Sequence, residues 1–153
     1  MIAISCPGFS MTPFEKMLTL ISPNFRAWEI IAEGMHAMSN IEENIRRAQD
    51  SFDIHFKVHA PFSDLNIASL NPKIRESSLN QIIDSIRVSS DLGIDLVSLH
   101  PGHKSPLGAY FPDKSAKTNK KSLIELDKAG EEYDVVLALE NMPKMWISLC
   151  ADA

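Results

Sequence analysis

Three residues that could bind a metal ion or move a proton follow apolar segments of the chain at nearly equal spacing. They are His59 in VHAP, His100 in SLHPG and Glu140 in ALEN, and they lie 41 and 40 residues apart. Imidazole nitrogens and carboxylate oxygens are usual ligands of zinc, manganese and iron(II). One histidine at such a place is more often structural. Three groups in a repeated position favour a divalent metal site, with Zn or Mn as the expected ion.

The segments around these residues alternate between short apolar runs and helical patterns. The expected strands cover residues 2–6, 26–32, 52–59, 94–100 and 135–140. The expected helices begin after the capping residues Thr12 and Ser39 and at Asn71-Pro72, and a fourth lies within 114–133. This alternation predicts an α/β fold of about five parallel strands in sequence order with four helices, as a single domain over residues 1–153. Parallel strands bind ligands at their carboxyl ends, where His59, His100 and Glu140 should meet.

The segment before His59 alternates strictly between apolar and polar residues. Side chains of a strand point alternately to its two faces. We therefore expect Phe52, Ile54, Phe56 and Val58 to pack against helices. His55, Lys57 and His59 should point the other way, to the concave interior face of the sheet.

Other polar residues have two readings. Glu29 and Glu33, on the second predicted strand, are either solvated carboxylates or functional groups. Asn141 and the Pro101-Gly102 pair fit turns, although Asn141 and His103 follow predicted strand ends and are candidates for substrate binding. His36 precedes the second helix, and we expect it at the surface.

Composition limits the class of protein. The chain has 153 residues, a formal net charge of −5 and no lysine- or arginine-rich block, which argues against unspecific binding of nucleic acid. No apolar run is long enough to cross a bilayer, and the first residues lack the basic region of a signal peptide. Cys6 and Cys150 are far apart in sequence and have no metal-ligand spacing, so reduced thiols in a cytoplasmic protein are expected.

The segments KVHAPFSDLNIAS, SLHPGH and LALENMP resemble the third, fourth and fifth strand ends of the xylose isomerase-like TIM-barrel superfamily. This superfamily includes sugar isomerases and epimerases and the endonuclease IV class of apurinic endonucleases. The resemblance implies that His59, His100 and Glu140 are metal ligands. It places Glu29 at the glutamate found after the second strand in many isomerase-like members, and it makes Glu140 and Glu29 candidates for proton transfer.

A complete (β/α)₈ barrel needs about 250 residues. The chain therefore resembles the N-terminal part of a partial TIM barrel, without the later strands that carry further ligands. The metal site should be incomplete, and the two open sheet edges should favour self-association.

Three functions remain open under this resemblance. The first is a metal-dependent isomerase or epimerase acting on a sugar or sugar phosphate, with Glu140 or Glu29 moving a proton. The second is a zinc-dependent apurinic endonuclease that cleaves DNA. The third is a barrel fragment without catalysis. The negative net charge and Glu29 favour the sugar enzyme.

Overall fold

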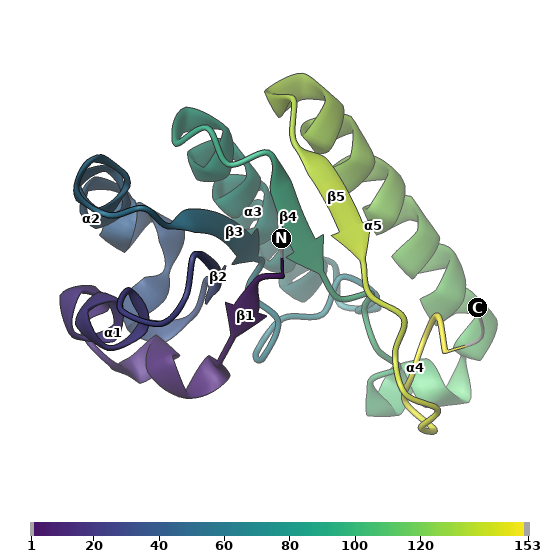
Figure 1. Cartoon of the computed structure of the whole chain (residues 1–153). Coiled ribbons are helices and arrows are strands. Elements are labelled where there is room, and N and C mark those ends of the chain that lie inside the picture. Colours follow the sequence, from purple (N-terminus) through teal and green to yellow (C-terminus); the bar gives the residue numbers. More distant parts are fainter. Residues whose placement is uncertain (1, 152–153) are drawn as a thin grey trace.

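Five parallel strands form one sheet in the order of the sequence (Figure 1). The computed structural model describes residues 2–151. The strands are β1 (Ile4–Ser5), β2 (Ala27–Ile31), β3 (His55–His59), β4 (Leu96–Leu99) and β5 (Val136–Leu139). Each pairs in parallel with the next along the chain, so β1 and β5 are the two edges. The predicted strand order is confirmed.

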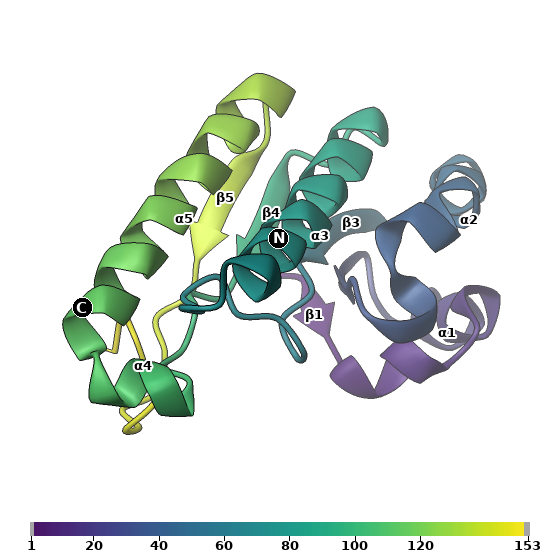
Figure 2. The same ribbon diagram turned by 180° about the vertical axis from the view of Figure 1, so that it is seen from behind.

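Helices cover one side of this sheet, as the view from behind shows (Figure 2). The long helices are α1 (Phe14–Ile21), α2 (Met38–Ser51), α3 (Pro72–Asp91) and α5 (Pro112–Tyr133). A short helix, α4 (Pro106–Tyr110), and two 3₁₀ turns, η1 (Pro7–Met11) and η2 (Gly34–His36), were not predicted. The α/β alternation is confirmed, with five α-helices instead of four within residues 2–151. None of these helices is both long and apolar enough to cross a membrane.

The helix starts were predicted with mixed success. Asn71 caps α3 as expected, because its side chain accepts a hydrogen bond from the backbone N–H of Lys73. The caps proposed at Thr12 and Ser39 are wrong. The residues before α1 and α2 are Pro13 and Ala37, and neither provides a side-chain cap. These two helices are held instead by their buried faces.

The two faces of the sheet differ as the pleat of the third strand predicts. Ile54, Phe56 and Val58 are buried, whereas His55 is exposed. Phe52 is the exception, with 41% of its surface exposed, because β3 begins only at His55 and leaves Phe52 outside the sheet. The strands thus turn their apolar side chains toward the helices.

A continuous hydrophobic core fills the layer between sheet and helices. Its fully buried members come from several elements: Met17, Ile30, Ile45, Val58, Ile86, Val88, Val97 and Leu126. His36 also lies here with only 1% exposure, so its predicted place at the surface is wrong. Its Nε2–H donates to the carbonyl of Thr12 over 2.8 Å, and its ring contacts Phe14, which together allow its burial.

Candidate metal centre

His59, His100 and Glu140 come together at the carboxyl ends of three neighbouring strands. His59 ends β3, while His100 and Glu140 directly follow β4 and β5. Nε2 of His100 lies 3.1 Å from Oε2 of Glu140, and Nε2 of His59 lies 3.5 Å from Oε1. One donor atom from each residue can be chosen so that all three lie within 4.8 Å of one another.

The ring of His59 is oriented for binding through Nε2. Its Nδ1 lies 2.7 Å from the carbonyl oxygen of Ala60, and only an Nδ1–H can donate there. The lone pair is then on Nε2, the atom that faces Glu140. A backbone carbonyl holding the second nitrogen is the usual arrangement around metal-binding histidines.

The donor set fits a divalent metal of borderline hardness. Zinc bonds of about 2.0–2.1 Å at tetrahedral angles place neighbouring ligand atoms about 3.4 Å apart. Each imidazole lies at about this separation from its nearer Glu140 oxygen, Oε2 for His100 and Oε1 for His59. Burial lowers the pKa of His100, the nearby His59 lowers it further, and Glu140 acts in the opposite direction. At neutral pH His100 is therefore uncharged and can offer a lone pair to a cation.

Phe62, in the loop after β3, packs against both histidines. Its ring centroid is 4.5 Å from that of His100 and 5.0 Å from that of His59. The two imidazoles are perpendicular, with centroids 4.9 Å apart. Phe62 thus restricts the rotation of both rings and covers them with an apolar surface. Phe62 was not among the predicted site residues, although it stands three residues after His59.

Glu33 holds the loop that carries Phe62. Its Oε1 accepts hydrogen bonds from the backbone N–H groups of Phe62 and Ser63, at 2.6 and 2.5 Å, and its Oε2 accepts one from the hydroxyl of Ser63. Burial alone would raise the pKa of Glu33, but the bonds from Ser63 and Phe62 outweigh it and lower the pKa. Glu33 is therefore an ionised group that fixes the loop.

A buried polar network holds the loop after β4. The side-chain oxygen of Asn66 accepts the backbone N–H of His103, and that of Asn119 accepts the N–H of Gly102. A Cβ at Gly102 would lie 2.4 Å from the backbone nitrogen of Ala68, so only glycine fits between the two loops. These contacts position the backbone just beyond His100.

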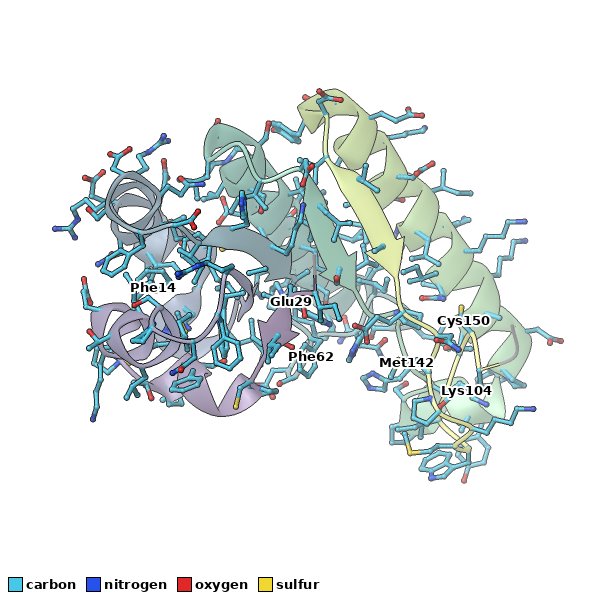
Figure 3. The ribbon with its side chains drawn as sticks, in the orientation of Figure 1. Phe14, Glu29, Phe62, Lys104, Met142 and Cys150 are labelled. Atoms are coloured by element: carbon cyan, nitrogen blue, oxygen red, sulfur yellow. The ribbon has the colours of Figure 1, made fainter. Side chains whose placement is uncertain are left out.

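The other predicted site residues lie apart from this cluster. Glu29 is in the middle of β2 and accepts a hydrogen bond of 2.8 Å from the hydroxyl of Ser98. Figure 3 shows Glu29 among the strands, whereas Met142 lies beyond the strand ends. His103 lines a pocket beside His100. Asn141 is exposed and has no hydrogen bond within the described part of the chain.

The chain is similar to known proteins in both sequence and structure. A family model described as xylose isomerase-like TIM barrel matches residues 21–153. The uncharacterized protein MJ1311 of Methanocaldococcus jannaschii is 37% identical over 132 residues, covering 84% of this chain and 44% of that protein. An apurinic-apyrimidinic endonuclease 1 of Plasmodium falciparum is 28% identical over 122 residues, covering 80% of this chain and 19% of that protein.

Among solved structures, a D-tagatose 3-epimerase-like protein is similar with a TM-score of 0.83 and 31% identity, covering 94% of this chain and 53% of that one. The chain thus spans about half the length of this protein and less than half of the curated relatives. The five parallel strands correspond to part of a TIM barrel, as the sequence resemblance implied. With the family model matching most of its length, the chain belongs to the xylose isomerase-like TIM barrel family.

Proposed function

We propose that the chain carries the metal-binding strands of an enzyme that isomerises or epimerises a sugar or sugar phosphate. The observation that carries this proposal is the convergence of His59, His100 and Glu140 at three successive strand ends. The similarity to a D-tagatose 3-epimerase-like protein supports the same class of substrate.

In this proposal, Nε2 of each histidine and one oxygen of Glu140 hold a divalent ion, zinc or manganese. When bound, the ion would polarise a substrate carbonyl and make the adjacent C–H bond more acidic. Phe62 covers the two imidazoles and keeps water from one side of them.

Proton transfer is assigned to carboxylates. Glu140 is the candidate at the cluster, because one of its oxygens is free when the other binds the ion. Glu29 is the second candidate, and the hydrogen bond from Ser98 holds its carboxylate on β2. A base must come within hydrogen-bond reach of the proton it removes. A substrate that loses a proton to Glu29 would therefore extend from the strand ends toward the middle of β2.

Solvent deuterium exchange tests this function with little demand on catalytic efficiency. The zinc- or manganese-loaded chain is incubated with a panel of ketoses and ketose phosphates in D₂O, and deuterium beside the carbonyl is followed by NMR. We expect uptake that is lost in His100→Ala and strongly reduced in Glu140→Gln. Equal uptake by the parent chain and His100→Ala would contradict the proposal.

The endonuclease reading has one observation in its favour, the similarity to the Plasmodium falciparum endonuclease. It predicts that the zinc-loaded chain cuts a duplex containing an abasic site, with loss of cutting in His100→Ala. Cutting without deuterium uptake would replace the sugar reaction by this one. If the metal-loaded chain shows neither deuterium uptake nor cutting of DNA, the non-catalytic function remains.

A further inference from the structure

A pocket of about 170 Å³ opens beside the metal cluster, and His100 is part of its wall. The loop after β3 contributes Phe62 and Leu65, and helix α3 contributes Ile82. Its outer wall comes from the segment after β5, through Met142 and Ile147. Residues far apart in the sequence therefore enclose one space that is continuous with the candidate metal centre.

The segment that closes the pocket is tied to the loop after β4. The backbone N–H of Lys104 donates to the carbonyl of Ile147 over 2.8 Å, and His103 and Ser148 form an antiparallel bridge. At the far end, the N–H of Met142 donates to the carbonyl of Cys150. Lys104, Met142 and Cys150 lie together beyond the ends of β4 and β5 (Figure 3). The outer wall is thus a hydrogen-bonded segment.

The pocket is lined mainly by apolar side chains. No lysine, arginine, aspartate or glutamate belongs to its described lining. Its polar side chains are those of His100, His103 and Ser148. Burial lowers the pKa of both histidines, so neither is a cation at neutral pH. Ser148 already donates its hydroxyl to the carbonyl of Pro143. A phosphate placed here would lose its water without gaining a cationic partner, which is costly. The lining therefore favours an uncharged, apolar group.

We propose that this pocket receives a short alkyl arm of the substrate, while the hydroxy-carbonyl end of the same molecule lies at His59, His100 and Glu140. The inference rests on the proposed function, because it needs a carbonyl compound at the cluster. An engineered apolar cavity of about 150 Å³ binds benzene, so the volume suits an arm of roughly four to six carbons. The substrate class is then a hydroxyketone with a deoxygenated, unphosphorylated end.

Calorimetry on the zinc-loaded chain tests the pocket with three probes. Hydroxyacetone has the hydroxy-carbonyl end alone, 1-hydroxyhexan-2-one adds a butyl arm, and 1,6-dihydroxyhexan-2-one ends the same arm in a hydroxyl. We expect 1-hydroxyhexan-2-one to bind at least about tenfold more tightly than hydroxyacetone, since three additional methylenes leave water. It should also bind more tightly than 1,6-dihydroxyhexan-2-one, because the terminal hydroxyl of that probe would lose its water in an apolar pocket. Equal affinity for all three probes would overturn the inference.

A pair of variants locates the effect. Ile147→Asp puts a charge into the pocket wall and should abolish the preference for the butyl arm while leaving hydroxyacetone binding unchanged. Ile124→Asp makes the same change at a half-exposed residue of α5 outside the pocket lining, and it should keep the preference. The same loss of preference in both variants would contradict the assignment.

The two proposals can fail separately. Failure of hydroxyacetone to bind, with the butyl probe still bound and sensitive to Ile147→Asp, would leave an apolar site and remove the proposed function. Binding of hydroxyacetone without any gain from the butyl arm would remove only the pocket. Binding of no probe would overturn both.

Discussion

The three residues of the candidate metal centre differ in how far their side chains are exposed to solvent. The side chain of His59 is 5% exposed and that of His100 25%, whereas that of Glu140 is 47% exposed. His59 ends an inner strand, and β4, which precedes His100, is also paired on both sides. Glu140 follows β5, which pairs with β4 alone within residues 2–151. The inner strands thus offer a pair of nitrogens that the surrounding protein largely buries, and the edge strand offers a carboxylate that is nearly half exposed.

The largest expected effect is on metal binding, and it should follow this difference. Removing a group that merely orients a ligand costs 10–100-fold in affinity. Losing a nitrogen ligand in His100→Ala should therefore weaken zinc binding by about a hundredfold or more. Glu140→Gln keeps an oxygen near the site and should cost about tenfold. Zinc titration against a chromophoric chelator measures both.

A larger loss in Glu140→Gln than in His100→Ala would reverse the comparison between inner and edge strands. His55→Ala is the matched histidine control, since His55 lies exposed at the opposite end of β3. It should bind zinc like the parent chain.

Overpacking the loop after β4 should have the next largest effect. Gly102→Ala forces a methyl group into Ala68 and should reduce the free energy of unfolding by roughly 1–3 kcal/mol. It should also weaken zinc binding, because the loop begins at His100. Urea unfolding and zinc titration measure the two quantities.

Gly8→Ala is the control for that substitution, since its nearest contact would be an ordinary 3.6 Å and its φ is not positive. Equal stability of the Gly102 and Gly8 variants would show that the loop can move aside, and that the inner strand end is less rigid than we infer.

The edge strand leads to a different expectation, self-association. Val136 and Leu139 of β5 are 63% and 46% exposed, and the edge offers unpaired backbone groups. We expect the sedimentation coefficient to rise with concentration in the micromolar range. Leu139→Lys should reduce the association, whereas Leu107→Lys, on the exposed face of α4, should not. A monomer at all concentrations would rule out this role of the edge.

The smallest expected effect concerns pH and lies in the N-terminal half. Burial lowers the pKa of His36 below its ordinary value of 6.5. The unfolded chain therefore binds the proton more readily than the folded one, and stability present above pH 6.5 is lost as the pH falls below it. In His36→Gln, which keeps a donor for Thr12, unfolding free energy should depend less on pH between 7.5 and 5. An unchanged slope would mean that other groups, such as His100 and His103, cause it.

The parts predicted from the sequence depend on local patterns. The alternation of Phe56, Val58 and their polar neighbours predicted the two faces of β3. The nearly equal spacing of His59, His100 and Glu140 predicted that they meet at the carboxyl ends of the strands. Parallel βα units repeat their geometry, so equal positions in successive units meet.

The features that sequence reasoning missed depend on contacts between distant segments. Glu33 accepts hydrogen bonds from a loop about thirty residues away in the sequence. His36 can be buried because the carbonyl of Thr12 accepts its hydrogen bond and the ring of Phe14 packs against it. The pocket wall at Ile147 forms because the carbonyl of Ile147 accepts a hydrogen bond from the backbone N–H of Lys104, which is distant in the sequence. No local pattern reports such contacts, and one residue type, such as histidine, fits both the surface and the core.

Anomalous diffraction from crystals soaked in zinc would show whether His59, His100 and Glu140 bind a metal ion together. We expect one strong zinc peak about 2.0–2.1 Å from Nε2 of both His59 and His100, with an oxygen of Glu140 as the third protein ligand. Zinc bound only elsewhere, with no peak between the two imidazoles, would contradict this expectation.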